Sequence, residues 1–286
     1  MITAVDKARK TSIASISTIC NGFGLKRDSF YKYHRRFKTK IAIEEKVLDM
    51  VKRERRIQPR VGTRKLHTDL QDDFKKLDFK IGRDRLFDIL RAQRMLVYKK
   101  RAYAKTTNSY HHFHKYNNLI KELKISKPNQ VWVSDITYIR TVKGFCYLAL
   151  ITDLYSRKIV GYDISDSLEL TGCLRAFKKA LKIARPKKGL IHHSDRGVQY
   201  CSHQYVNELK KRGIKISMTE ENHCYENAVA ERVNGILKDE FYLDQCFFST
   251  ANAKKATKNA IEIYNNKRLH LSLGYKTPNK MFEIAA

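Results

Sequence analysis

The fold is decided by residues 131–139, which read VWVSDITYI. Apolar and β-branched side chains fill this run without glycine or proline, so it predicts a buried β-strand. Val131, Val133 and Ile139 share one strand face with Asp135, because side chains alternate between the two faces with a period of two. A carboxylate on an apolar face costs free energy unless it is paired or bound to a metal. The stretch therefore predicts a strand and, at Asp135, a candidate site.

Two more β-rich runs follow over residues 147–152 and 159–164. Turn signals at Lys143-Gly144 and Ser156-Arg157 separate the three runs, and this short spacing predicts antiparallel hairpins. The remaining periodicity predicts a helix over 168–183, a strand over 190–193, a helix over 204–212, a strand over 215–218, and helices over 227–237 and 251–264. The order βββαβαβα is that of an α/β fold of the ribonuclease-H-like class.

Two more acidic residues stand out by their place in this pattern. Asp195 directly follows the strand over 190–193, and Glu231 lies on the helix over 227–237. Functional side chains often sit at the carboxyl ends of strands in open α/β sheets. Together with Asp135, these acids have the donor chemistry to bind two Mg²⁺ ions about 3.5–4 Å apart, an arrangement used in phosphodiester chemistry. Spacing alone is weak evidence in a chain with 29 acids, because some triple of acids will match almost any spacing. The residues that flank each acid must therefore distinguish a site from a chance match.

The helix of Glu231 carries a polar stripe. Asn227, Asn234 and Lys238 lie four residues before, three after and seven after Glu231, so all four share one helix face. This stripe suits a DNA phosphate lying across the metals, and we interpret these side chains as DNA contacts. The alternative is a solvated amphipathic face.

The charge of the chain favours a polyanionic partner. There are 58 basic and 29 acidic residues, a net charge of +29, and such a field favours nucleic acid. Residues 1–127 carry 33 basic and 13 acidic side chains, a net of +20, and residues 128–286 carry 25 and 16, a net of +9. Electrostatic binding is therefore assigned to the N-terminal part. A merely basic or ribosome-associated protein is the alternative.

Residues 1–38 have the pattern of a helix-turn-helix unit that binds DNA. The pattern consists of apolar residues at helical spacing, Ile13, Ile16, Ile19 and Cys20, then a turn over 21–24, then a basic helix anchored by Phe30, Tyr31 and Phe37. The expected DNA contacts are Lys26, Arg27, Lys32, Arg35 and Arg36. An ordinary helical hairpin with solvated charges is the alternative.

A second helical unit, similar to a helix-turn-helix, is expected over residues 39–98. It includes a short helix over 63–70 and a helix over 83–96. Leu86, Phe87, Ile89 and Leu90 would face inward in the second of these helices, while Arg83 and Arg85 would face outward as DNA contacts. Residues 128–286 would then form the catalytic core with its C-terminal helical tail.

Residues 99–127 are basic, polar and weakly periodic, so we expect a linker. The histidines of the 111–114 cluster lack a Cys or Asp partner at ligand spacing, which favours a solvated or phosphate-contacting segment over a metal site. The chain shows neither a signal peptide nor an apolar run of membrane-spanning length. Six dispersed cysteines without a CxxC pair fit a reduced cytosol.

Several motifs together resemble one family. They are Trp132-x-x-Asp135-Ile136-Thr137-Tyr138, His193-Ser194-Asp195-Arg196-Gly197-x-Gln199-Tyr200, Asn227-Ala228-x-Ala230-Glu231, Lys238, Tyr264-Asn265-x-Lys267-Arg268-x-His270 and Leu273-Gly274-Tyr275-x-Thr277-Pro278. This set resembles bacterial insertion-sequence transposases related to retroviral integrases, of the OrfB type made from the second of two reading frames. The 35 residues between Asp195 and Glu231 match the interval of that group.

The resemblance implies a mechanism. Asp135, Asp195 and Glu231 would be the catalytic residues and would hold two Mg²⁺ ions, for which Mn²⁺ can substitute, and no zinc is expected. Water would cut one strand at an element end, and the freed 3′-hydroxyl would attack another phosphodiester. Lys238 would contact the terminal DNA, and Lys267 and Arg268 are further expected contacts.

The resemblance also implies partners. These are double-stranded DNA, as terminal inverted repeats and as target, a second copy of the chain on DNA, and an OrfA segment supplied by fusion or as a partner. The setting would be the nucleoid in a bacterial cytoplasm. Two other functions stay open: a catalytically silent DNA-binding protein that needs OrfA, and a ribonuclease-H-like nuclease acting on RNA–DNA hybrids.

Overall fold

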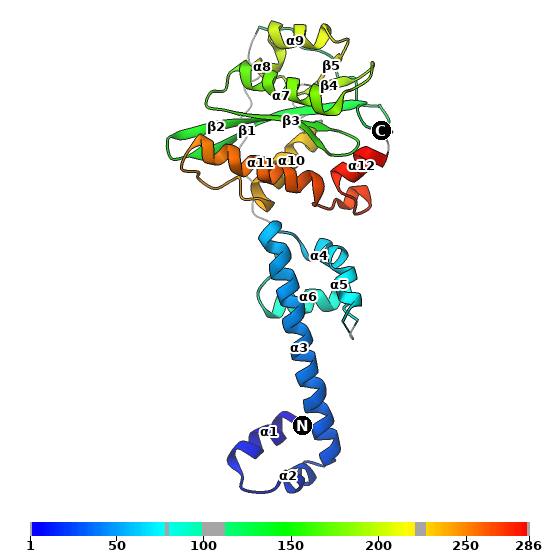
Figure 1. The fold of residues 1–286 in the computed structure, drawn as a ribbon, viewed down its shortest axis with the longest axis vertical. Helices are drawn as coiled ribbons and strands as arrows, with labels where there is room; N and C mark the ends of the chain where they lie inside the picture. Colours follow the sequence, from blue (N-terminus) through cyan, green and yellow to red (C-terminus); the bar gives the residue numbers. More distant parts are fainter. Residues whose placement is uncertain (1, 78–79, 99–111, 221–226, 285–286) are drawn as a thin grey trace. The chain divides into compact units, whose positions relative to one another are not determined.

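The computed structural model describes residues 2–77, 80–98, 112–220 and 227–284. The chain divides into two compact units (Figure 1). The first comprises Met1–Arg56 and Gly62–Leu96, and the second comprises Ile57–Val61 and Val97–Ala286. Each unit buries apolar side chains of its own.

The second unit is built on a five-stranded sheet. Its strands are β1 (Val131–Thr141), β2 (Gly144–Asp153), β3 (Ile159–Ser165), β4 (Ile191–Ser194) and β5 (Lys215–Met218). They lie in the order β3-β2-β1-β4-β5. The pairs β1–β2 and β2–β3 are antiparallel, whereas β4 runs parallel to both β1 and β5. The predicted hairpins and the ribonuclease-H-like α/β class are confirmed.

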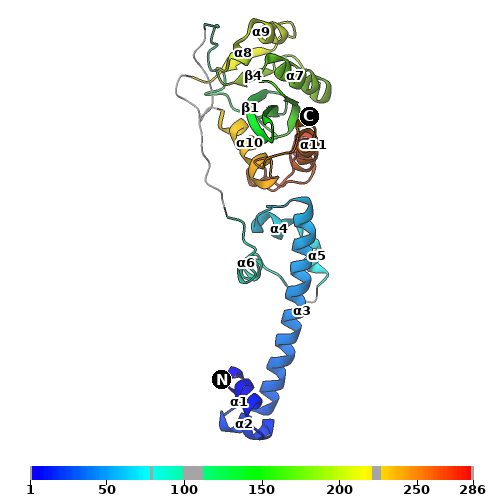
Figure 2. The same ribbon diagram turned by 90° about the vertical axis from the view of Figure 1, so that its left-hand side faces the viewer.

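Helices cover both faces of this sheet, as Figures 1 and 2 show. One face carries α7 (Leu170–Ala184), α8 (Val198–Cys201) and α9 (His203–Lys210), and the other carries α10 (Ala228–Glu240) and α11 (Thr250–Asn266). A 3₁₀ turn (Leu271–Leu273) and α12 (Pro278–Ile284), which the sequence reading did not foresee, complete the tail.

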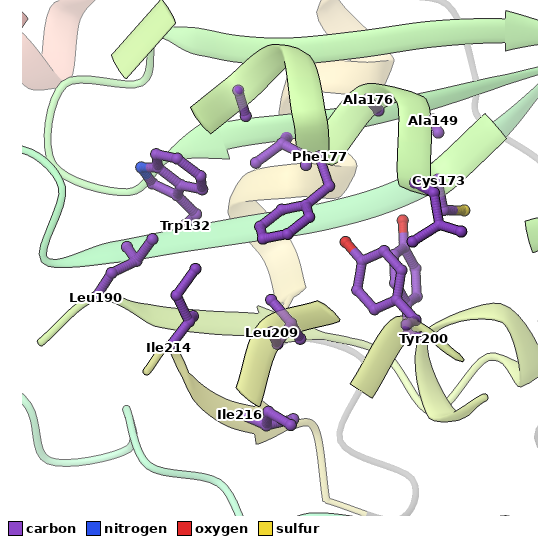
Figure 3. Close-up of a cluster of buried hydrophobic side chains, with 14 of the residues drawn as sticks. Trp132, Ala149, Cys173, Ala176, Phe177, Leu190, Tyr200, Leu209, Ile214 and Ile216 are labelled. Atoms are coloured by element: carbon purple, nitrogen blue, oxygen red, sulfur yellow. The ribbon is translucent and has the colours of Figure 1, made fainter. Parts of the chain in front are cut away.

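Among the described residues, each face of the sheet carries a large hydrophobic core, and a smaller cluster joins Val131, Val133 and Ile191 to Ala230 of α10. Figure 3 shows the first, in which Trp132 of β1 packs with Phe177 of α7 and Leu209 of α9. The second buries Ile139 of β1 against α10 and α11. Leu148 of β2 belongs to the second core and its neighbour Ala149 to the first, as the period of two requires.

Helix α7 approaches β3 closely at Gly161. A Cβ atom there would lie 2.7 Å from the Cβ of Ala180 and 2.8 Å from its backbone nitrogen. We therefore expect Gly161→Ala to destabilise the protein by about 1–3 kcal/mol through overpacking, measured by urea unfolding. Gly235→Ala is the matched control, because that site has open space within α10, and alanine should there stabilise by about 0.5–1 kcal/mol. Equal stability of the two variants would contradict the close packing.

The first unit begins with a small helical cluster. It consists of α1 (Ile2–Thr11), α2 (Ile16–Gly22) and the start of α3 (Arg27–Ile57). Ser15 caps α2 by accepting a hydrogen bond from the Thr18 backbone N–H, and Gly24 turns the chain with φ +66°. Val5, Ile19, Cys20 and Phe30 are buried together. Helix, glycine turn and basic helix follow one another as the sequence indicated.

Three details of that prediction were wrong. Ile13 lies outside the helices and is fully exposed, because α1 ends at Thr11 and α2 begins at Ile16. Tyr31 and Phe37 are exposed, not anchoring, since only the face of α3 that carries Phe30 meets α1 and α2. Helix α3 also runs unbroken across position 38, where we expected one helical unit to end, because no glycine or proline interrupts it.

The rest of the first unit is helical as expected. It contains α4 (Thr63–Asp69), α5 (Gln71–Lys75) and α6 (Arg83–Ala92). Leu86, Ile89 and Leu90 of α6 are buried, while Phe87 is only half-buried. The long helix α3 buries Val47 and Val51.

The expected linker is partly structured. Residues 99–111, with His111, lie outside the described residues, but Phe113 and Tyr116 pack against the first core of the second unit. The backbone N–H of Leu119 donates to Ser217 Oγ at 2.9 Å, which attaches this segment to β5. Among the residues described, no helix is long and apolar enough to cross a membrane.

Candidate active site

Strand pairing brings the two predicted aspartates to one level of the sheet. Ser134 of β1 is paired with Ser194 of β4 in parallel register. Asp135 directly follows Ser134, and Asp195 directly follows Ser194. Both aspartates therefore lie at the level where β4 ends. Glu231 lies in the first turn of α10, which packs on the β1 face that carries Asp135.

The three carboxylates interact electrostatically. The pKa of Asp135 rises to about 7, chiefly through burial and then through the negative charge of Asp195, with a smaller contribution from Glu231. The pKa of Glu231 is also raised, by burial first and then by Asp195. The site therefore concentrates like charges, and a bound cation would relieve their repulsion.

Hydrogen bonds hold the aspartates in place. The Asn234 side-chain Nδ2 donates to Asp135 Oδ2 at 2.7 Å, and the backbone N–H of Ile136 donates to Oδ1 at 2.9 Å. Asp195 Oδ1 accepts from the backbone N–H of Gly197 at 3.1 Å. Both carboxylates are thus oriented by donors of the protein itself.

The donor chemistry fits a hard divalent cation. Carboxylate oxygens are the ligands that Mg²⁺ prefers, and the mutual repulsion of Asp135, Asp195 and Glu231 favours one. Within the described ranges, however, no three His, Cys, Asp or Glu side chains are grouped closely enough to hold a metal ion as they stand. The carboxylates would have to draw together around the ion.

The two asparagines of the polar stripe have partners inside the protein. Asn227 and Asn234 are 3% and 5% exposed. Asn227 Nδ2 donates to the backbone oxygen of Ser134 at 3.1 Å, and Asn234 donates to Asp135. The side chains of these two asparagines meet the sheet, not solvent, so in this structure they bond β1 where we expected DNA contacts.

Lys238 remains on the same side of α10 and near Asp135. Burial lowers the pKa of Lys238, while the negative charges of Asp135 and Asp244 act in the opposite direction. The side chain is half-buried. It stays a candidate for contacting a DNA phosphate beside the carboxylates.

Arg268 has a partner that the sequence reading did not foresee. It is 3% exposed, and its Nε and Nη2 donate to the two carboxylate oxygens of Glu240, at the end of α10, at 2.8 and 2.6 Å. The Arg268 guanidinium, which we expected to contact DNA, is therefore held in a bidentate ion pair with Glu240. The neighbouring Lys267 is exposed.

The rest of the tail motif braces the sheet. The Tyr264 hydroxyl donates to the Arg157 backbone oxygen at 2.9 Å. Asn265 accepts from the Ile159 backbone N–H and donates to the oxygen of the same residue, both at 3.0 Å. The motif thus fastens α11 to the start of β3.

A buried polar network lies behind Asp135 and was missed at the sequence level. His192 Nε2 lies 2.8 Å from Ser134 Oγ and 3.0 Å from the Tyr205 hydroxyl. Burial, with a smaller effect of His193, lowers the pKa of His192 to about 3, so the ring is neutral. The sequence around a histidine in an apolar strand does not indicate which side chains it will bond, since Ser134 and Tyr205 come from other elements of the fold.

Most of the basic residues that we expected to contact DNA in the first unit are exposed, and some of them form ion pairs. Lys26, Arg27, Lys32, Arg35 and Arg36 are all exposed, and Lys32 forms an exposed ion pair with Asp28. Arg83 pairs with Asp84, and Arg85 with Glu44 of α3, so their charges are partly neutralised. In the second unit, His112 and His114 are exposed as well.

The sheet order and the acidic cluster define an integrase-type core. In agreement, residues 125–224 match the family described as "Integrase core domain", and residues 212–278 match a second family with the same description. Such a core implies dependence on a divalent metal ion.

More particularly, the chain belongs to the family of OrfB-type insertion-sequence transposases. It is 37% identical over 266 residues to the "Insertion element IS600 uncharacterized 31 kDa protein" of Shigella sonnei, covering 91% of this chain and 96% of that protein. It is 38% identical over 158 residues to the "Transposase for insertion sequence element IS629" of Shigella sonnei, covering 55% and 53%. It is 36% identical over 165 residues to "Transposase InsF for insertion sequence IS3A" of Escherichia coli (strain K12), covering 57% of each. The matched region thus spans about half the length of the IS629 and IS3A transposases.

The chain is also similar to two solved structures at low sequence identity. The HTLV-2 integrase catalytic core domain in complex with magnesium has a TM-score of 0.44 and 20% identity, covering 55% of this chain and 97% of that one. A simian T-cell lymphotropic virus intasome in complex with PP2A regulatory subunit B56 gamma has a TM-score of 0.48 and 17% identity, covering 78% and 70%.

Proposed function

We propose that this DNA transposase cuts the 3′ ends of its element and transfers them to a new phosphodiester, using Asp135, Asp195 and Glu231. The observation that carries the proposal is the electrostatic coupling of these three carboxylates, which come from β1, the end of β4 and α10. Membership in the transposase family supports the same reaction class.

The three acids are the proposed ligands of two Mg²⁺ ions, with Mn²⁺ as a substitute. When bound, such ions activate an attacking oxygen and stabilise the leaving one. The protein's own part is orientation: Asn234 and the Ile136 N–H hold Asp135, and Gly197 holds Asp195. Lys238 is proposed to bind the terminal phosphate, supported by its closeness to Asp135.

The proposed partners follow from this chemistry. The substrate is double-stranded DNA, first as the inverted repeats of the element and then as target. Two ends must meet for transfer, so we propose that copies of the chain assemble on DNA, with an OrfA segment contributing end recognition. The nucleoid in the bacterial cytoplasm is the proposed place of action.

The exposed basic residues of the first unit are proposed to hold DNA electrostatically. Replacing Lys26, Lys32, Arg35 and Arg36 by Gln should flatten the dependence of log K on log salt concentration by about 0.9 per lost phosphate contact. Fluorescence anisotropy on a labelled duplex over a KCl series measures this slope. Lys75→Gln, in an exposed ion pair on α5, serves as control, and an unchanged slope in the quadruple variant refutes the assignment.

Substrate choice separates this function from its two alternatives. A transposase should nick a labelled duplex that carries an element end, whereas a ribonuclease-H-like nuclease should cut only an RNA–DNA hybrid. A catalytically silent binding protein should shift the duplex in a gel without cutting it, even with OrfA added. Specific nicking of the duplex supports the proposal, and cutting restricted to the hybrid overturns it.

A further inference from the structure

Two buried asparagines attach α10 to β1 on either side of Glu231. Asn227 immediately precedes the helix, and its Nδ2 donates to the Ser134 backbone oxygen. Asn234 lies one turn beyond Glu231, and its Nδ2 donates to the Asp135 carboxylate. The helix that carries one acid is therefore bonded directly to the strand that carries another.

The spacing of these two attachments fixes the orientation of the helix. Asn227 and Asn234 are seven residues apart, about two turns or 10 Å along the axis, so they lie on the same side of α10. Two attachments on one side add to the packing of Val233 and Leu237 in the second core, and together they oppose rotation of α10 about its axis. Glu231, between them, is held at a set angle to β1.

The chemistry of the bond to Asp135 is directional. An amide NH₂ group donates only, so Asp135 Oδ2 must accept, while the Ile136 N–H occupies Oδ1. Donors at both oxygens fix the plane of the carboxylate. Each oxygen keeps lone pairs for a cation, because a carboxylate accepts about four hydrogen bonds in all.

Packing alone does not account for these amides. The Oδ1 atoms of Asn227 and Asn234 are buried and have no hydrogen-bond partner among the described residues. Burying a polar atom without a partner costs free energy that an apolar side chain would not incur. The hydrogen bonds that the Nδ2 groups donate, to the Ser134 backbone oxygen and to the Asp135 carboxylate, explain why asparagine stands at both positions.

We propose that Asn227 and Asn234 are positioning residues that set the Asp135 carboxylate and the angle of Glu231 for joint metal binding. This inference rests on the proposed function, in which both acids bind the ions. It assigns the asparagines a role without contact to DNA.

Metal binding by the full-length chain tests the proposal independently of catalysis. The probe is Mn²⁺, titrated into the protein and followed by the EPR signal of the free ion, and Asp135→Asn defines the binding that belongs to this site. Because partners that orient metal ligands typically contribute 10–100-fold to affinity, Asn234→Ala should weaken this binding by about 10–100-fold. Asn227→Ala should weaken it as well and serves if Asn234→Ala does not fold.

Asn265→Ala is the control, since that amide also attaches a helix to a strand, through two hydrogen bonds to Ile159 of β3. It should lower the thermal midpoint as Asn234→Ala does while leaving Mn²⁺ affinity within about twofold of wild type. Wild-type affinity in folded Asn234→Ala, or an equal loss in Asn265→Ala, overturns the positioning role alone. A wild-type chain that binds no Mn²⁺ at this site overturns the proposed function and this inference with it.

Discussion

Asp195→Asn is expected to abolish DNA cleavage and joining while DNA binding persists. The substitution removes one negative charge and one ligand oxygen from the proposed metal site. A catalytic metal ion contributes several kcal/mol of transition-state stabilisation, and about 4 kcal/mol corresponds to roughly a thousandfold in rate. Cleavage of a labelled element-end duplex in Mg²⁺ measures the loss, and a gel shift on the same duplex measures binding.

The matched control is Asp166→Asn, which changes an exposed acid between β3 and α7. It should cut at the wild-type rate. If Asp195→Asn also cuts at that rate, Asp195 is not in the catalytic site, and the assignment of all three acids fails with it.

Arg268→Ala should strongly destabilise the second unit. The guanidinium is buried and bonds Glu240 through two hydrogen bonds, so its removal breaks both of these bonds to a carboxylate of low exposure. Breaking a buried pair in this way costs about 3–5 kcal/mol. For a unit of this size the thermal midpoint should fall by about 6–20 °C, as followed by circular dichroism.

Lys211→Ala is the comparison variant, because its ion pair with Glu208 leaves the lysine 70% exposed. Such a pair contributes about 0–1 kcal/mol, so the midpoint should barely move. If Arg268→Ala instead keeps its midpoint but loses affinity for DNA, the arginine contacts DNA, as the sequence suggested, and the buried pair is not its main role.

The sheet and its acids were predictable because their signals are local. A strand such as 131–139 alternates its faces with a period of two, and the pairing of Ser134 with Ser194 then places Asp135 beside Asp195. Helices α7, α10 and α11 carry apolar periodicity of their own. The strands and helices themselves need no knowledge of distant residues, whereas the pairing of β1 with β4 is given by the structure.

Partners of polar side chains were harder to predict. Asn234 shares a helix face with Glu231, and that face was correctly identified, but whether it meets DNA or the sheet depends on how α10 packs. Arg268 reads as a surface cation until Glu240, 28 residues earlier, is found beside it. In the first unit, Tyr31 and Phe37 resembled anchors because composition alone does not say which face of α3 is covered.

The most direct test of the central claim is one reaction with the wild-type chain. A duplex carrying the DNA end that flanks this reading frame, labelled at the strand to be cut, is incubated with Mg²⁺ and the product is resolved on a denaturing gel. The account predicts a single nick at the 3′ end of the element, followed by a joined product, both abolished by EDTA. If wild-type protein yields neither product even with the OrfA segment supplied, or yields the nick unchanged in EDTA, the assignment of a metal-dependent transposase site to Asp135, Asp195 and Glu231 is contradicted.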